Sequence, residues 1–460
     1  MPLTRRALVS ASVLGVSALA PGLGVAAATA DPSRRILVVG AGIAGIAAAR
    51  SLADQGYAVT VLEARDRIGG RIHTSRIWPD LPVELGASWI HEHIGNPLTA
   101  VATQAGLTMV STDYDSAVTY DARLGRIPTG AGSAYDRMLR RIEAGIRRGY
   151  ALPRDTALRG HLERSIGFAT LDEAQQRLAN HHIVSLADDE FAGDSAQLSA
   201  WYWDSMGGFE GLDVVLPHGY DRLVGYLADG LDIRLGAVVR RVDRLANGVR
   251  VHTDDEVIAA ARVIVTVPLG VLKHAAIEFH PALPPRKRAA VRALGMGSGT
   301  LTKVWLRFPD TFWDTTDWIE HVADADERGR FHQWLNAAQL TGQPLVCGFL
   351  GGAYAARAET WTDARIVAEA MEVLRTMYGA RIPDPVGWQI PRWSRDPFSY
   401  GSYSFNALGS RPQMRNDLAG PIAGRVFFAG EATHRSLFAT AHGAYLSGLR
   451  AARQVRAVDE

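Results

Sequence analysis

The stretch Arg35–Arg71, RILVVGAGIAGIAAARSLADQGYAVTVLEARDRIGGR, decides the fold. An apolar run at residues 36–39 predicts a buried strand, and a second run at 58–62 predicts another. Between them lie a glycine-rich turn and an alanine-rich segment that predicts a helix. A strand, helix and second strand of this length are typical of a parallel nucleotide-binding sheet.

The glycines of this stretch have the spacing G-x-G-x-x-G, at Gly40, Gly42 and Gly45. Gly40 permits a tight turn, Gly42 lets a pyrophosphate approach the backbone, and Gly45 lets the helix pack closely on the strand. Glu63 follows the second strand, where an acid can accept hydrogen bonds from a ribose. Because the pattern lies between a strand and a helix, it predicts a dinucleotide site.

The residues after Glu63, ARDRIGGR at 64–71, add two glycines and three arginines beside the predicted phosphates. A nicotinamide site has no use for this extension, so it favours a long, tightly held dinucleotide such as FAD. A second G-x-G-x-x-G is absent, which argues against a separate NAD(P) domain. The net charge of +1 over 460 residues predicts no broad basic face for nucleic acid.

Residues 1–30 are typical of an export signal. Arg5 and Arg6 precede a weakly apolar stretch that ends in an A-x-A site at Ala30, which indicates the twin-arginine route. Pro21 and several glycines interrupt the stretch, so it is a poor membrane span. We therefore expect an exported protein without a stable membrane span after signal removal.

Three later segments predict strands that complete the first sheet: a hairpin over 233–251 closed by Asn247-Gly248, a buried run at 261–267, and RVFFAG at 425–430 before a C-terminal helix. The predicted fold class is α/β. A discontinuous Rossmann-like FAD-binding domain (31–90, 215–280 and 393–460) carries an inserted α+β substrate-binding domain of mixed sheet and helices (91–214 and 281–392).

Nine segments spread over the chain resemble the flavin-containing amine oxidases, and among them the polyamine oxidases. They are GAGIAG, LEARDRIGGR, VELGASWIH (83–91), VTVPLGVLK (265–273), FHPALPPRKRAAVRALGMG (279–297), TKVWLRF (302–308), RWSRDPFSYGSYS (392–404), FFAGEATH (427–434) and ATAHGAYLSG (439–448). The region 100–200 matches least, and it is where these enzymes differ in substrate.

The resemblance implies non-covalent FAD, because the lone Cys347 lies in an apolar run far from the C-terminal flavin segment and is expected to be a buried, inert thiol. Glu431 would contact the ribityl and phosphate part, and the helix from about Ala441 would point its positive end at the flavin. The residues expected at the cofactor are Gly40, Gly42, Ala44, Gly45, Glu63, Arg65, Gly70, Arg71, Gly86, Ala87, Ser88, Trp89, Val238, Trp393, Gly430, Glu431, Thr440 and Ala441.

Lys303 is the strongest catalytic candidate, since a lysine in the apolar strand pattern TLTKVWLRF is costly to bury. In the family the matching lysine holds a water against flavin N5, which receives a hydride from the carbon beside the amine nitrogen. Dioxygen then regenerates the flavin and gives hydrogen peroxide, while the imine hydrolyses to an aldehyde and a shorter amine. Trp393 resembles the tryptophan near the reactive face, and His91 resembles a histidine that contacts substrate.

The expected substrate residues are His91, Glu190, Tyr403, Phe438 and Thr440. Thr440 stands where many relatives have a tyrosine, and Phe438 could supply the missing aromatic wall. Remote ammonium groups of a polyamine need carboxylates, for which Glu92, Glu190, Asp194 and Glu210 are candidates; Glu190 falls nearest a family acid.

The predicted function is therefore a secreted FAD-dependent polyamine oxidase acting on a small amine and O2. The alternatives are a flavin oxidase of monoamines or L-amino acids and a non-catalytic FAD-binding protein. Trp89-Ile90-His91 replaces the arginine that would face an amino-acid carboxylate. No Cys/His cluster with ligand spacing suggests a metal site.

Overall fold

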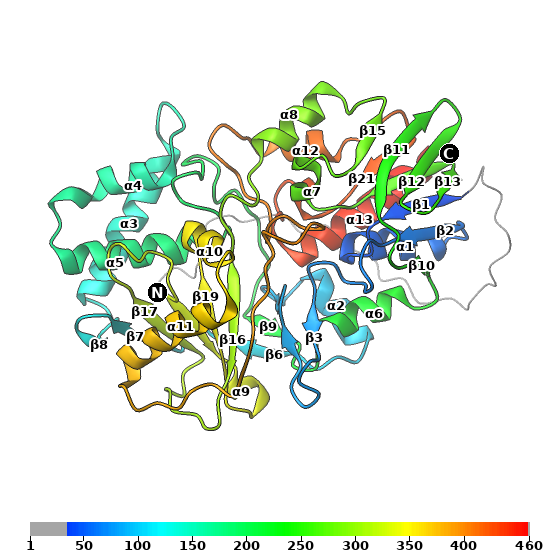
Figure 1. Cartoon of the computed structure of the whole chain (residues 1–460). Helices are drawn as coiled ribbons and strands as arrows, with labels where there is room; N and C mark the ends of the chain where they lie inside the picture. Colours follow the sequence, from blue (N-terminus) through cyan, green and yellow to red (C-terminus); the bar gives the residue numbers. More distant parts are fainter. Residues whose placement is uncertain (1–34, 459–460) are drawn as a thin grey trace.

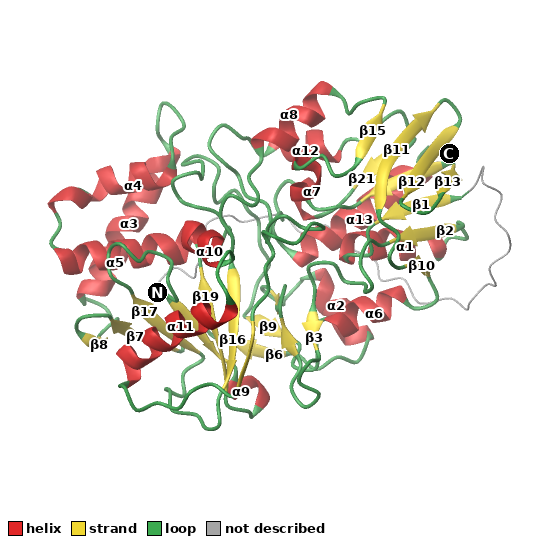
Figure 2. Ribbon diagram, viewed as in Figure 1, coloured by secondary structure: helices red, strands yellow, loops and turns green. Residues whose placement is uncertain are grey.

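The structure of the protein, a computed structural model, describes residues 35–458 (Figure 1). The predicted twin-arginine signal, residues 1–30, lies outside the described residues. Helices and strands separate into two groups of layers, each with its own sheet (Figure 2). Within residues 35–458, no helix is both long and apolar enough to cross a membrane.

The first group contains a five-stranded sheet in which every neighbouring pair is parallel. Its order is β10 (Asp232–Arg234), β2 (Val59–Leu62), β1 (Ile36–Val39), β14 (Arg262–Val265) and β21 (Val426–Phe428). The strands come from segments up to about four hundred residues apart, so the expected α/β sheet assembled from distant pieces is confirmed.

Successive side chains of β1 point to opposite faces of the sheet and so contribute to two separate hydrophobic cores. Ile36 and Val38 pack with helices on one face, and Leu37 and Val39 pack with a second sheet on the other. The helices are α1 (Ile43–Ala53), α2 (Pro97–Gln104), α6 (Asp221–Ala228) and α13 (Ala441–Arg456). Helices α1 and α13 lie side by side (Figure 1), so closely that a Cβ on Gly448 would be 2.1 Å from the Ala44 carbonyl oxygen.

The second sheet has the order β13 (Val257–Ala260), β12 (Gly248–Thr253), β11 (Val239–Leu245) and β15 (Glu278–His280). The expectation that the hairpin at 233–251 extends the first sheet is therefore wrong. Only residues 232–234 join that sheet, and β11 and β12 pack on its face instead. The turn is Ala246-Asn247, because Leu245 pairs with Gly248 and Gly248 already begins β12.

The other group is built on a seven-stranded sheet that combines both predicted inserts. Its order is β20 (Gly387–Gln389), β16 (Thr302–Arg307), β19 (Leu345–Leu350), β18 (Gln333–Asn336), β17 (Trp318–Val322), β7 (Ala117–Asp121) and β8 (Gly125–Ile127). Side chains of α10 (Gly352–Ala358) and α11 (Asp363–Tyr378) pack with one face. The helices α3 (Ala134–Tyr150), α4 (Leu158–Ile166) and α5 (Glu173–Ile183) form a bundle at one end (Figure 1).

The remaining elements of the described chain are two small sheets and four short α-helices. A small sheet contains β5 (Trp89–Ile90), β9 (Asp213–Val215) and β6 (Val110–Thr112), and another contains β3 (Thr74–Ser75) and β4 (Val83–Glu84). Helix α8 (Pro285–Ala293) packs with α7 (Leu269–Lys273) and α12 (Gln413–Ala419). Helix α8 lies after residue 281, where the sequence predicts the start of a substrate-binding segment. It nevertheless packs with helices of the predicted cofactor-binding segments. Helix α9 (Ala338–Thr341) follows β18 along the chain.

Candidate active site

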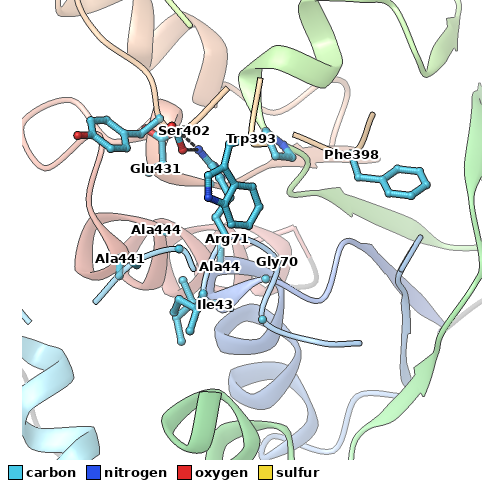
Figure 3. Close-up of a pocket in the computed structure, with 18 of the residues that line it drawn as sticks. Ile43, Ala44, Gly70, Arg71, Trp393, Phe398, Ser402, Glu431, Ala441 and Ala444 are labelled. Atoms are coloured by element: carbon cyan, nitrogen blue, oxygen red, sulfur yellow. Dashed lines mark hydrogen bonds and ion pairs between the residues drawn. The ribbon is translucent and has the colours of Figure 1, made fainter. Parts of the chain in front are cut away.

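A cavity of about 340 Å³ runs from the carboxyl ends of the parallel strands to the seven-stranded sheet. The residues around its nucleotide end come from the starts of α1 and α13, the 64–71 segment and the 393–402 segment (Figure 3). Every residue expected at the cofactor lines this cavity except Gly45. A Cβ on Gly45 would be 1.9 Å from the Gly40 carbonyl oxygen, so Gly45 allows strand and helix to pack.

Glu63 holds the glycine turn in place. Its buried carboxylate accepts hydrogen bonds from the Ala41 amide at 2.6 Å and from the Arg65 amide at 3.0 Å. Gly42 is the N-cap of α1, so the unpaired amides of the first turn begin at the cavity wall. Unpaired amides at a helix start can bind the phosphates of a dinucleotide. A contact of Glu63 with a ribose stays a prediction.

Two arginines of the 64–71 segment are fixed by acids from the C-terminal part of the chain. Arg65 pairs with Asp396 at 2.7 Å. Arg71 donates to Glu431 at 3.0 Å and to the Ser402 carbonyl at 2.9 Å (Figure 3). These pairs connect segments more than three hundred residues apart around the nucleotide end of the cavity.

Glu431 is the buried centre of this network. Its carboxylate also accepts hydrogen bonds from the Ser404 hydroxyl at 2.7 Å and the Ala439 amide at 2.8 Å. Burial alone would raise the pKa of Glu431, but the nearby guanidinium groups of Arg71 and Arg415 and these hydrogen bonds lower it overall. The acid is therefore held ionised although it is only 4% exposed.

Helix α13 begins at the same wall. Thr440 is its N-cap, and the Thr440 hydroxyl accepts a hydrogen bond from the Gly443 amide at 2.9 Å. Both Thr440 and Ala441 line the cavity. The partial positive charge of the helix start thus meets the cavity, as the sequence predicts for a site that stabilises negative charge.

The loop at 86–89 forms another part of the cavity wall. A Cβ on Gly86 would be 1.8 Å from the Arg71 carbonyl oxygen and 3.2 Å from Trp393, so only glycine fits there. Trp393 is buried and donates its indole N–H to the Leu85 carbonyl at 2.9 Å. The tryptophan and this loop are thereby fixed against each other, with both exposed to the cavity.

Lys303 reaches the loop from β16. Along that strand Val304 and Leu306 pack with the face that α11 covers, so Lys303 and Trp305 lie on the other face. The Lys303 ammonium donates to the Gly86 carbonyl at 2.5 Å and to the Ser88 hydroxyl. Burial lowers the pKa of Lys303 to about 8, so the neutral amine is accessible near neutral pH.

Three stacked aromatic rings and a fourth, tilted ring line the cavity beyond Lys303, and sequence reasoning missed three of the four. Trp318 lies parallel to Trp89 at 5.9 Å and to Tyr114 at 4.9 Å, while Phe349 is 6.3 Å from Trp89. Trp318 and Phe349 lie in buried strands, and the sequence pattern cannot distinguish an aromatic residue at a cavity from one in the ordinary core. Their position beside the cavity follows only from strand order.

The expected substrate residues divide into two groups. His91, Glu190, Tyr403 and Thr440 line the cavity. Phe438 does not: it is fully buried, 3.7 Å from the Arg415 guanidinium and packed near Phe191. The structure therefore places Phe438 in the core, and the aromatic wall of the cavity is formed by Trp318 and its neighbours instead.

Of the four carboxylates considered for remote ammonium groups, Glu190 alone lines the cavity. Glu92 accepts a hydrogen bond from the Phe209 amide, Asp194 pairs with Arg328 at 3.1 Å, and Glu210 is exposed. Cys347 is fully buried away from the cavity lining, and burial raises the pKa of its thiol to about 12. Residues 35–458 contain no cluster of His, Cys, Asp or Glu suited to a metal ion.

These features fit a flavin dinucleotide. The turn before α1 requires glycine at Gly40 and Gly45, and acids pair with the arginines beside it. The loop at 86–89 packs against Trp393 where a flat ring could lie. The family profile described as flavin containing amine oxidoreductase matches residues 43–456, nearly the whole of the described chain.

The chain belongs to the flavin-containing amine oxidoreductase family. FAD is accordingly its cofactor. "Polyamine oxidase 2" of Arabidopsis thaliana is 34% identical over 448 residues, covering 93% of this chain and 89% of that protein. "Lysine-specific histone demethylase 1 homolog 1" of the same plant is 36% identical over 444 residues, covering 91% of this chain but 52% of the demethylase. The chain thus spans about half the length of that demethylase.

A solved structure of a redesigned putrescine oxidase has the same fold as this flavin-containing amine oxidoreductase. The TM-score is 0.75 at 21% identity, with 92% of this chain and 99% of the other covered. The five-stranded parallel sheet and the seven-stranded sheet of this chain therefore belong to the fold seen in that structure.

Proposed function

We propose that the protein is an exported FAD-dependent oxidase of polyamines. The observation that carries the proposal is Lys303, a buried lysine at the cavity wall that donates to the Gly86 carbonyl and the Ser88 hydroxyl. A non-catalytic FAD-binding protein would gain nothing from a buried lysine at this wall, which costs desolvation energy. FAD held by the 64–71 segment and the starts of α1 and α13 would supply a two-electron acceptor for the carbon beside an amine nitrogen, with dioxygen as the final acceptor.

The residues around the cavity have complementary tasks. Lys303, with its lowered pKa, can hold a water and exchange a proton with it. Trp393 and the loop at 86–89 exclude bulk water from the reacting carbon. The aromatic wall around Trp318 offers ring faces to a flexible cationic chain, and Glu190 offers a carboxylate. This combination favours an aliphatic di- or polyamine over an amino acid.

A substrate screen tests the proposal. We expect anaerobic addition of spermidine or spermine to the purified yellow protein to bleach the flavin absorbance, and readmission of air to release hydrogen peroxide. Benzylamine, leucine and a methyl-lysine peptide serve as comparison substrates, because they represent monoamine oxidation, amino-acid oxidation and demethylation. Bleaching by one of these three, with none by polyamines, would contradict the proposal.

Export is the second part of the proposal, and it rests on Arg5-Arg6 and the A-x-A site at Ala30. We expect the full chain to leave the cytoplasm with FAD already bound and to begin at Asp31 afterwards. Changing Arg5 and Arg6 to lysine should retain it inside the cell. N-terminal sequencing of the exported protein measures the cleavage site, and cell fractionation measures where the lysine variant is retained. An uncleaved cytoplasmic wild-type protein would contradict export.

A further inference from the structure

His91 and Asp213 form a hydrogen-bonded pair beside the cavity. In the small sheet, Ile90 of β5 pairs with Val214 of β9 in antiparallel register, so the next residues along each strand meet as well. The Nδ1 atom of His91 is 2.6 Å from the Asp213 Oδ2 atom. The His91 ring lines the cavity and lies parallel to Trp89 at 6.4 Å.

The backbone next to His91 is distorted in a way that serves this pair. Glu92 has φ of 50°, a conformation that L residues other than Asn and Asp seldom adopt. This conformation lets the Glu92 amide donate to the Asp213 Oδ1 atom at 2.8 Å. Both carboxylate oxygens of Asp213 are therefore engaged by adjacent residues of one loop, and strain of this kind is typical of functional sites.

The geometry assigns the tautomer of His91. An ionised carboxylate is only an acceptor, so Nδ1 must carry the hydrogen that it donates to Asp213. In the neutral ring Nε2 then has a lone pair, and no residue within 35–458 makes a hydrogen bond to it. Other ionisable groups near the ring are Glu92 and His93 on its own loop, Lys303 behind Trp89, and His442, which contacts the side chain of Asn96.

We infer that Asp213 is a positioning residue that makes Nε2 of His91 an acceptor for the ammonium group of the substrate. The inference rests on the proposed function, because it names how that site receives a cationic amine. A proton passes from the substrate nitrogen to Nε2, which leaves the nitrogen lone pair free, and the resulting imidazolium stays paired with the Asp213 carboxylate. Amine oxidation requires the neutral amine, so this step prepares the substrate.

The tautomer can be measured directly. In the FAD-loaded protein labelled with 15N-histidine, the His91 resonances are assigned by their loss in His91→Gln. We expect the wild-type protein at pH 8 to carry the proton on Nδ1, with Nε2 unprotonated. A neutral His91 with its proton on Nε2 would overturn the inference, whatever the enzyme oxidises. This measurement needs no variant of Asp213 and no substrate.

Asp213→Asn supplies the kinetic test. The Glu92 amide would hold the side-chain oxygen of the new amide, so its NH2 group would face Nδ1 and force the His91 proton onto Nε2. We expect kcat/KM for spermidine to fall about tenfold or more, with unchanged FAD content. Asp243→Asn is the matched control: Asp243 is 2.7 Å from His252, with similar side-chain exposure, on the second sheet.

The outcomes separate the two proposals. The inference is supported if Asp213→Asn loses activity and shows an Nε2–H signal for His91, while Asp243→Asn keeps its activity. An unchanged kcat/KM in Asp213→Asn would overturn it. If the wild-type protein oxidises no amine at all, the proposed function fails, while the 15N measurement still decides the tautomer.

Discussion

Lys303→Met is expected to slow reduction of the bound flavin by an amine about a hundredfold or more while FAD content stays unchanged. The physical reason is that Lys303 is buried at the cavity wall, 6% exposed, and donates to the loop at 86–89. Methionine has a similar length and keeps the packing against Trp89, but it can neither hold a water nor exchange a proton. Stopped-flow absorbance under anaerobic conditions measures the reduction rate.

Lys273→Met is the matched control for this change. Lys273 ends α7 and donates to backbone carbonyls of residues 291, 292 and 294, and it does not line the cavity. Its replacement should leave the reduction rate unchanged. An equal reduction rate in Lys303→Met and the wild-type protein would remove Lys303 from the reaction.

Lys303→Met should also change the pH dependence of the free energy of unfolding. Burial lowers the pKa of Lys303 from 10.5 to about 8 in the folded state. Below pH 8 the folded protein bears the whole cost of burying the charge, and this cost is relieved as pH rises from 8 to 10.5, because the unfolded chain then binds more protons. Lys303→Met should therefore raise the free energy of unfolding most below pH 8, and the advantage should diminish towards pH 10.5 in urea titrations.

Glu431→Gln is expected to release FAD and to destabilise the protein by about 3 kcal/mol or more, the effect of removing one partner from a buried ion pair. Glu431 is the acceptor for Arg71 and Ser404, and Arg415 lies nearby with its guanidinium fully buried. A neutral amide would leave the buried guanidinium of Arg415 and the partly exposed guanidinium of Arg71 without their acid. Flavin fluorescence in the filtrate and urea unfolding measure the two effects.

The pH dependence of this contribution has a defined sign. The pKa of Glu431 is lowered in the folded state, so its contribution is fully present above the ordinary pKa of glutamate, 4.5, and is lost as pH falls through the folded value. Glu372→Gln is the control, since Glu372 pairs with Arg330 but is 69% exposed. Retention of FAD with unchanged stability in Glu431→Gln would contradict the central role of this acid.

Much of the cofactor site could be predicted from sequence because its requirements are local. Gly40, Gly45 and Gly86 stand where the backbone must turn or approach another chain segment closely, and a sequence shows such glycines directly. Lys303 was visible because a lysine interrupts an apolar strand. The expected flavin-binding site then followed from segments that resemble one family and occur in that family's order along the chain.

The errors concern long-range packing. The hairpin at 233–251 has the correct pattern for a strand pair, but pattern alone cannot tell whether that pair extends the parallel sheet or packs on its face. Phe438 was placed at the substrate because it is near Thr440 in sequence, whereas its ring turns into the core beside Arg415. Trp318 and Asp213 had no local signal, since an aromatic residue in a strand and an acid in a loop are both ordinary.

The sequence by itself determined the dinucleotide turn, the FAD cofactor and the buried lysine that we propose for catalysis, because glycine spacing, strand periodicity and a buried charge are properties of short segments. The tertiary structure alone decided which aromatic rings line the cavity and which acid pairs with His91. The order of the seven-stranded sheet brings Trp318 and Phe349 to Trp89, and the register of β5 with β9 brings Asp213 to His91. These contacts depend on which strands become neighbours, and that is set by the packing of the whole chain.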